Sequence, residues 1–220
     1  MYERISLPNE KKEAIIYAPP GPLLKFINNF ASSTAETSFP KIKHFSRFLS
    51  EEEIIDIFAF KKVDIVISCE PVVASGIVSE MIYSAMMPLV CRKDHPQREQ
   101  LSSPDKIQEV MMNERWAASS IAYSHFDFIR TSQAYNELTT IRDVAFESDS
   151  PEIVAHFINQ SDAIGFISDP LNKLIDEAGS DKLMKLPYQS IKLDFYINYQ
   201  AKQDNAHVLK VVDMFKQLES

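Results

Sequence analysis

The amino-acid sequence predicts an α/β protein in which buried parallel strands alternate with amphipathic helices. Residues 63–68 (VDIVIS) form an apolar run rich in β-branched side chains, which is typical of a strand buried on both faces. Residues 191–199 alternate apolar and polar side chains with the period of a half-buried strand. A strand–helix–strand–helix–strand order is complete by Ser68, and parallel strands joined by helices predict a doubly wound arrangement.

Composition limits the class of protein. The 220 residues suffice for one large domain or two small ones. The net charge of −8 argues against direct DNA contact by most of the chain, because DNA-binding domains present basic faces. Cys69 and Cys91 lack the spacing of a metal site or a disulfide framework, which favours a reducing cytoplasm. Residues 1–12 are polar and are interpreted as a linker remnant, and no apolar run predicts a signal peptide or a membrane span.

The first half of the chain contains three expected strands and two expected helices. The strands are expected at residues 13–17, 40–48 and 63–68. The first helix begins at Pro20 or Pro22, because proline is tolerated in a first turn, where its missing N–H would lack a partner anyway. The second helix follows Ser50, which forms a capping box with Glu53, since the two side chains satisfy free N–H groups reciprocally.

The second half continues the alternation. Strands are expected at residues 86–90, 116–119, 141–146, 163–167, 183–186 and 191–199. Helices are expected at residues 103–112, from Pro151 onward, at 170–178 before Gly179, and at 207–218. In the helix that begins at Pro151, the apolar side chains expected to face inward are Ile153, Val154, Phe157 and Ile158.

Three segments carry a resemblance to a known family. They are VDIVIS at residues 63–68, the basic segment Arg92-Lys93-Asp94-His95-Pro96, and AIGFISDPLNKLI at residues 163–175. With the order of elements over residues 13–218, they resemble the effector-binding domain of LysR-type transcriptional regulators, most closely the branch of the LeuO and nodulation regulators. The third segment keeps the second glycine of the family pattern as Gly165 and replaces the first glycine with Ala163.

The resemblance implies a two-lobed, type 2 periplasmic-binding-protein-like fold in which each lobe is a mixed sheet flanked by helices. Lobe I is expected at residues 13–90 and 200–220 and lobe II at residues 91–199, with hinge crossings near residues 90 and 195. The family's N-terminal winged helix-turn-helix is absent from this sequence, so DNA contact is expected only through a domain outside it.

The resemblance also implies a homodimer or homotetramer. In the side-by-side antiparallel dimer of the family, the first helix and the strand of His44 would face the second lobe of another copy. Phe26, Phe30 and Phe157 are the candidate contacts, and the alternative for each is a place in the chain's own core.

A small-molecule effector is expected in the cleft between the lobes, because α/β sheets bind ligands at the C-terminal ends of their strands. The candidate binding residues are Pro20, Gly21, Cys69, Glu70, Ser119, Ser120, Glu147, Ser148 and Phe166. Each strand end has a structural alternative. Pro20 and Gly21 would start a helix, Glu70 would be a solvated or lobe-bridging carboxylate, the Ser119–Ser120 pair would be a polar loop, and Ser148 would cap a helix.

The chemistry of these residues limits the ligand. Pro19 and Pro20 remove two N–H donors where the family commonly has Ser or Thr, which weakens carboxylate binding. Glu70 and Glu147 favour a neutral or cationic ligand over a dianion. Cys69 is a poor candidate redox sensor, because an adjacent carboxylate raises the pKa of a thiol. The histidines are scattered singly, so neither a metal nor another cofactor is expected.

Three functions are open at this point. The favoured one is the effector-binding and oligomerisation domain of a cytoplasmic LysR-type regulator. The alternative is a solute-binding protein of a transporter with the same two-lobe fold, against which the lack of a signal peptide counts. An enzyme is disfavoured, because no nucleophile–base pair, phosphate loop or zinc motif has a recognisable spacing, and a fold alone specifies no chemistry.

Overall fold

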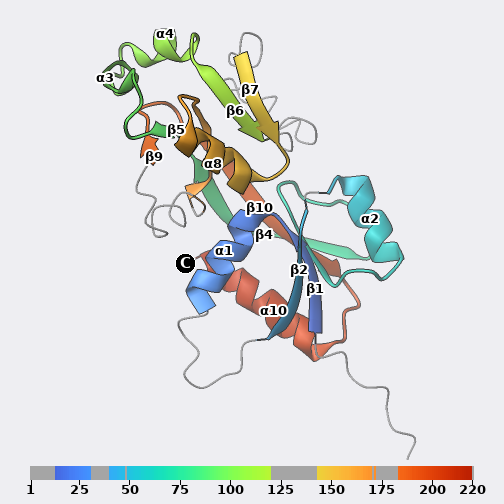
Figure 1. The fold of residues 1–220 in the computed structure, drawn as a ribbon. Coiled ribbons are helices and arrows are strands. Elements are labelled where there is room, and N and C mark those ends of the chain that lie inside the picture. The colour runs from blue at the N-terminus through green and yellow to red at the C-terminus, as the bar shows by residue number, and fades with distance from the viewer. Residues whose placement is uncertain are drawn as a thin grey trace, which may run out of the picture. The chain divides into compact units, whose positions relative to one another are not determined.

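The computed structural model describes residues 13–30, 40–47, 49–119, 143–169, 171 and 183–219. The chain divides into two compact units (Figure 1). Unit 1 comprises Met1–Tyr83 and Asp194–Ser220, and unit 2 comprises Ser84–Leu193. The division falls within two strands, β4 (Ile77–Met87) and β10 (Ile191–Gln200), so the chain crosses between the units twice. The expected linker at residues 1–12 and most of the helix expected at residues 170–178 lie outside the described residues.

Unit 1 is built on a five-stranded sheet with the strand order β2-β1-β3-β10-β4. Strand β1 (Glu13–Ala18) pairs in parallel with β2 (Lys41–Ser46) and with β3 (Ile65–Ser68), and β10 pairs antiparallel with β3. All four residues of β3 are buried, as the apolar run in the sequence predicts for a strand covered on both faces. The predicted parallel α/β arrangement is therefore confirmed for β1, β2 and β3.

Helices cover both faces of this sheet (Figure 1). On one face, Ile54 and Phe58 of α2 (Glu51–Ala59) pack in one cluster with Val66 of β3. On the other face lie α1 (Pro20–Phe30) and α10 (Ala206–Lys216), followed by the short helix η1 (Gln217–Glu219). Alternation along β3 explains the two layers, because successive side chains of a strand point to opposite faces.

Local signals place the start of two helices as expected. α1 begins at Pro20, and Ser50 caps α2 in the predicted capping box, with its hydroxyl accepting the Glu53 N–H at 3.2 Å. Phe26 of α1 is fully buried and stacks on Phe215 of α10, with ring centroids 4.2 Å apart. Phe26 therefore belongs to the core of unit 1, and its expected role as a contact between copies is wrong.

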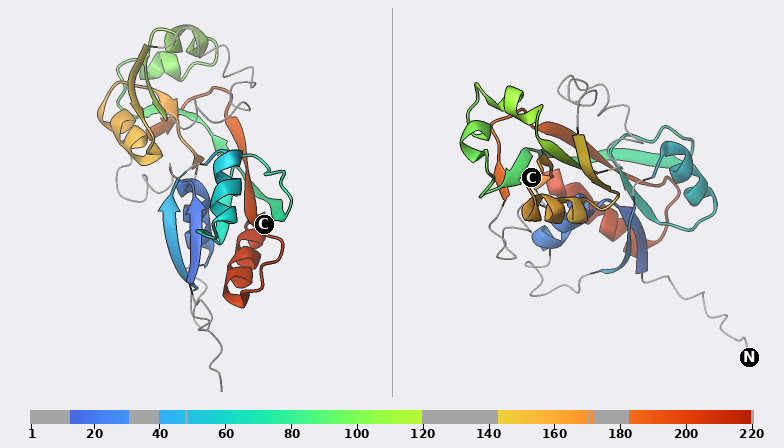
Figure 2. Two further views of the ribbon diagram at one scale, coloured as in Figure 1. Left: turned by 90° about the vertical axis from the view of Figure 1, so that its right-hand side faces the viewer. Right: turned by 45° about the horizontal axis from the view of Figure 1, so that its top comes forward.

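Unit 2 contains an antiparallel and a parallel group of strands. β8 (Gly165–Phe166) and β9 (Leu183–Lys185) flank β5 (Leu89–Arg92), whereas β6 (Arg115–Ser119) pairs in parallel with β7 (Asp143–Ser148). A bridge between Trp116 and Ile164 connects the two groups. Helix α8 (Pro151–Gln160) packs across β5, β6 and β7 (Figure 2). Two short helices, α3 (Arg98–Leu101) and α4 (Ile107–Met111), connect β5 to β6.

Three expectations for this part of the chain are wrong. The helix expected at residues 103–112 is shortened to α4, because residues 104–106 form a turn; the unexpected α3 precedes it and ends before Pro104, which has no N–H to continue that helix. The strand expected at residues 86–90 is divided between β4 and β5, with Pro88 between them. Ile153 is 51% exposed instead of inward, because the buried face of α8 is formed by its neighbours Val154, Ala155 and Ile158.

Candidate functional site

Unit 1 places four of the predicted residues at the C-terminal ends of β1 and β3. Pro20 is half-buried and Gly21 is buried, directly after β1 ends at Ala18. Cys69 and Glu70 follow the last residue of β3, and Glu70 is exposed whereas Cys69 is buried. Because β1 and β3 are paired in parallel, their C-terminal ends lie at the same edge of the sheet. At this edge the carboxylate of Glu70 is exposed to solvent, and α1 begins with Pro20.

A hydrogen-bonded relay fixes the backbone at Glu70. Asn198 of β10 is fully buried and donates to the carbonyl of Val66 at 3.1 Å and to the hydroxyl of Ser68 at 2.8 Å. The Ser68 hydroxyl in turn donates to the carbonyl of Glu70 at 2.6 Å. Backbone carbonyls only accept, so the amide nitrogen of Asn198 must face them. The sequence interpretation missed Asn198, although an amide within an apolar alternating strand is a signal for a buried polar partner.

Cys69 has no feature of a reactive thiol. Its burial raises the pKa of the thiol far above the ordinary value, and the charge of Glu70 raises it further. A redox sensor needs an exposed and electropositive thiol, because the thiolate is the reacting form. The position of Cys69 therefore favours a packing role over a chemical one.

Unit 2 brings two of the predicted serines together. Ser119 and Ser148 are register partners at the C-terminal ends of the parallel strands β6 and β7. The Ser148 hydroxyl accepts the N–H of Ser150 at 3.1 Å, and the Ser150 hydroxyl caps α8 by accepting the N–H of Ile153 at 3.4 Å. Ser150 therefore caps α8 directly, and Ser148 supports the cap by accepting the N–H of Ser150. Ser119 is the register partner of Ser148 on the neighbouring strand. Ser120 lies outside the described residues.

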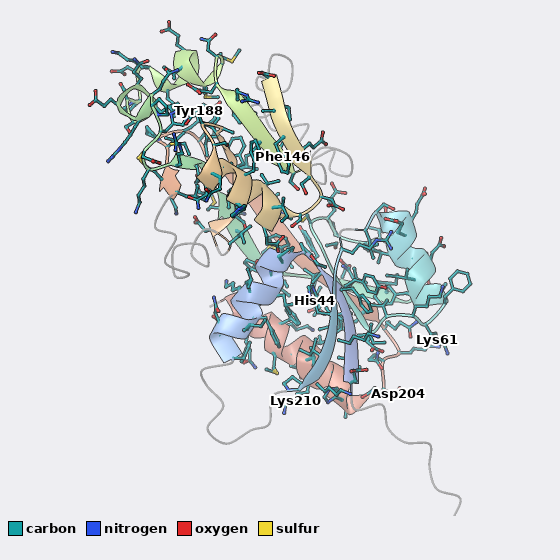
Figure 3. The ribbon with its side chains drawn as sticks, in the orientation of Figure 1. His44, Lys61, Phe146, Tyr188, Asp204 and Lys210 are labelled. Carbon is teal, nitrogen blue, oxygen red and sulfur yellow. The ribbon has the colours of Figure 1, made fainter. Side chains whose placement is uncertain are left out.

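The other two predicted residues of unit 2 do not join this pair. Glu147 precedes Ser148 on β7 and is exposed, and adjacent residues of a strand point to opposite faces. Phe166 of β8 is half-buried between Trp116 and Tyr188, with ring centroids 6.1 and 6.5 Å away. Figure 3 shows Tyr188 and Phe146 in different parts of unit 2, and Phe146 stacks on Phe157 of α8 at 4.4 Å.

Neither a metal centre nor a membrane span is found in the part of the chain that the structure describes. Within those ranges, no group of three or more His, Cys, Asp or Glu side chains is placed to hold a metal ion. None of the described helices is long and apolar enough to cross a membrane.

Similarity to known proteins is found at the level of three-dimensional structure and not of sequence. No protein-family model matches the chain, and no curated protein matches it either. Among solved structures, the regulatory domain of HypT from Salmonella typhimurium in its apo form is 11% identical, with a TM-score of 0.65, and the match covers 96% of this chain and 97% of that one. The chain has the fold of LysR-type regulatory domains.

Two longer regulators show the same likeness. DarR of Vibrio fischeri, solved in complex with DNA, is 11% identical with a TM-score of 0.68, over 95% of this chain and 69% of that one. VV2_1132, a LysR family transcriptional regulator, is 12% identical with a TM-score of 0.66, over 98% of this chain and 70% of that one. The predicted two-lobed, type 2 periplasmic-binding-protein-like fold is thereby confirmed.

Proposed function

We propose that this chain is the effector-binding and oligomerisation domain of a LysR-type transcriptional regulator. The observation that carries the proposal is the match of almost the whole chain to almost the whole of a regulatory domain. DNA would be contacted through a separate winged helix-turn-helix domain, since this chain has a net charge of −8. Such a regulator would act in the cytoplasm.

The effector would contact strand-end residues. Pro20, Gly21 and Glu70 are the candidates in unit 1, and Ser119 and Ser148 are the candidates in unit 2. An effector shifts the balance between two arrangements of the lobes only by binding one of them more tightly. The exposed carboxylates Glu70 and Glu147 favour a neutral or cationic small molecule.

Glu70→Ala is expected to change effector binding with little change in stability. Glu70 is exposed, and substitutions at such positions usually change the free energy of unfolding by less than about 0.5 kcal/mol. The measurement is a thermal-shift screen of the purified protein against amino acids, amines and sugars. Glu99→Ala, at an exposed position of α3, is the matched control. A compound that stabilises the wild type and Glu70→Ala equally would count against a role for Glu70.

We also propose an antiparallel dimer that joins unit 1 of one copy to unit 2 of the other. In unit 1, Ile27 of α1 is 39% exposed and Phe45 of the edge strand β2 is 37% exposed. In unit 2, Ile153 of α8 is exposed. Lys43 on β2 and Glu152 on α8 are also exposed, so the two surfaces carry opposite charges beside apolar side chains. This combination supports an interface with an apolar centre and a charged rim.

Ile153→Asp is expected to weaken this dimer about tenfold or more, since it removes an apolar contact and would bury an unpaired charge in the interface. Sedimentation over a concentration series measures the dissociation constant. Phe60→Asp is the control, because Phe60 follows α2 and is 69% exposed outside the proposed interface. Equal effects of both substitutions, or a wild-type monomer, would contradict this arrangement.

A solute-binding protein of a transporter remains the second candidate, because it would have the same fold. The coding sequence upstream of the Met1 codon separates the two. An in-frame winged helix-turn-helix supports the regulator, whereas an in-frame signal peptide supports the solute-binding protein.

A further inference from the structure

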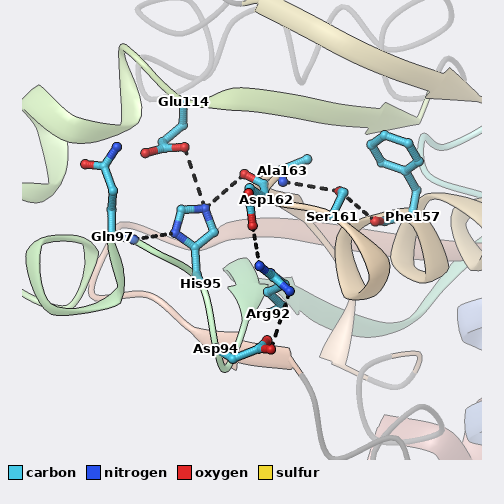
Figure 4. Close-up of polar contacts among 9 residues, drawn as sticks. All are labelled: Arg92, Asp94, His95, Gln97, Glu114, Phe157, Ser161, Asp162 and Ala163. Atoms are coloured by element: carbon cyan, nitrogen blue, oxygen red, sulfur yellow. Dashed lines mark hydrogen bonds and ion pairs between the residues drawn. The ribbon is translucent and has the colours of Figure 1, made fainter.

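Unit 2 contains a buried histidine–glutamate pair that the proposed effector site does not use (Figure 4). His95 follows β5 and Glu114 precedes β6, and their side chains are 1% and 8% exposed. The His95 Nε2 atom lies 3.6 Å from Oε2 of Glu114. Buried ionisable groups are costly unless they are neutral or paired, so the protonation state of this pair decides its effect on the fold.

The hydrogen bonds of His95 define a neutral imidazole ring. Its Nδ1 atom accepts the backbone N–H of Gln97 at 3.1 Å, so Nδ1 carries no proton. Its Nε2 atom lies 2.9 Å from the carbonyl oxygen of Asp162, which can only accept, so Nε2 carries the ring proton. Protonation of Nδ1 would replace an acceptor by a donor and would break the bond to Gln97.

Among the described residues, no lysine or arginine forms an ion pair with Glu114. Oε1 of Glu114 is buried and has no hydrogen-bond partner among the described residues. Arg92 is engaged by Asp162 at 2.5 Å and by Asp94 at 3.4 Å. Burial raises the pKa of Glu114, and the charge of Asp162 adds to this shift, whereas a positive charge on His95 would oppose it.

Further ionisable groups near Glu114 are Cys91 and Arg92 of β5, Arg98 of α3, and Arg115, the next residue along the chain. Cys91 of β5 is buried, and burial together with the charge of Glu114 raises the pKa of its thiol to about 12. Arg98 of α3 and Arg92 of β5 oppose that shift. A neutral thiol adds no charge, and the Asp162 carboxylate is already paired with Arg92.

The α3–α4 segment is attached at one end through this pair. The Gln97 N–H bonds to the His95 ring, and the N–H of Arg98 bonds to the carbonyl of His95 at 3.0 Å. At the other end, the indole N–H of Trp116 donates to the carbonyl of Met111 at 3.2 Å. Ile107, Met111 and Trp116 share one buried cluster. Glu114 follows the end of α4 closely in sequence, and it lies beside His95, which binds the start of the segment at Gln97. A charge on Glu114 would therefore affect both ends of the α3–α4 segment.

We propose that Glu114 is a proton-binding site of unit 2, protonated when the α3–α4 segment is packed, and that release of this proton to solvent loosens the segment. The deprotonated carboxylate would be buried beside a neutral imidazole, and either opening of the segment or protonation of His95 would relieve it. Both responses break the Gln97 N–H bond to His95. The proposal concerns unit 2 alone and is independent of the proposed effector.

The direction of the pH dependence follows from the raised pKa of Glu114. A glutamate carboxyl in an unfolded chain has a pKa near 4.3. The packed segment therefore gains stability from Glu114 below about pH 4, and this gain is lost as the pH rises through the higher pKa of the packed state. Each pKa unit of difference between the two states corresponds to about a tenfold change in the opening equilibrium.

Hydrogen exchange of the Gln97 amide, measured by NMR, tests the proposal on the whole chain. In Glu114→Gln, this amide should be better protected than in wild type near pH 8 and equally well protected near pH 4. Glu109→Gln, at an exposed position of α4, should behave as wild type at both values. Identical protection of Gln97 in wild type and Glu114→Gln across the pH range would overturn the proposal.

A second measurement does not depend on any variant folding. The carboxyl carbon of Glu114 in ¹³C-labelled wild type should titrate above the ordinary range of glutamate, and the emission of Trp116, the single tryptophan of the sequence, should change over the same pH interval. Titration of Glu114 near pH 4.3, the ordinary value, would refute the proton site.

Discussion

Gly165→Ala is expected to destabilise unit 2 strongly, by about 3 kcal/mol or more. A Cβ atom on Gly165 would collide with the carbonyl oxygen of Ala117 and would lie 2.8 Å from Cδ1 of Ile158. The carbonyl belongs to β6 and cannot move alone, because the N–H of Ala117 bonds to the carbonyl of Ile164 at 2.9 Å. Overpacking of flexible side chains typically costs about 1–3 kcal/mol, and a fixed backbone atom should place this substitution at or above the upper end.

Urea unfolding followed by circular dichroism measures the effect in both units, and Trp116 fluorescence reports on unit 2, where Trp116 is buried and forms a bridge with Ile164. Gly76→Ala is the control. Gly76 has a φ of +83°, but no atom lies within 4 Å of an added Cβ, so only the left-handed backbone is penalised, at about 1–2 kcal/mol. A Gly165→Ala protein as stable as Gly76→Ala would show that β6, β8 and α8 are not packed as described.

Gly165 also illustrates what the sequence could and could not predict. The segment at residues 163–167 was expected as a strand with a glycine in a family pattern, and β8 is there. The reason for the glycine is a close approach between β8, β6 and α8, which are separated along the chain by the lengths of whole elements. The periodicity of apolar residues and the composition of a segment indicate only local structure. They therefore predicted the strand but not the elements that pack against it.

Elements whose signals are local were predicted well. The strand β3, the start of α1 and the capping box of α2 each depend on residues within one turn or one strand. The division of residues 98–111 into α3 and α4 was missed, because both helices are shorter than two turns and are held by the buried residues Leu101, Ile107 and Met111. Tertiary packing, and not helix propensity, determines such short elements.

The candidate site divides in the same way. The rule that ligands bind at strand ends selected Ser119 and Ser148 separately, and only the register of β6 and β7 shows that they are partners. The Asn198 relay joins residues 130 positions apart, and the Glu114 partner of His95 was not foreseen although His95 belongs to a quoted segment. Polar pairs across elements leave no periodic signal, so the sequence alone could not locate them.

Ile65→Asp is expected to unfold unit 1. Ile65 is fully buried in β3, where it pairs with Ile16 of β1 and with Tyr199 of β10. An aspartate there would be ionised without a partner, and an unpaired buried charge typically costs about 3–5 kcal/mol in addition to the lost apolar contacts. Typical domains have a free energy of unfolding of only about 5–15 kcal/mol, so this substitution should remove most of the stability of unit 1.

Circular dichroism during heating and limited proteolysis measure the result. The matched control is Ile55→Asp, which places the same charge on the partly exposed side of α2, where water can solvate it. The control should melt within a few degrees of wild type, since surface changes are usually worth less than about 0.5 kcal/mol. A soluble Ile65→Asp protein with the melting temperature of the control would require β3 to lie at the surface. The assignment of β3 to the parallel sheet, and of Glu70 to the C-terminal edge of that sheet, would then be wrong.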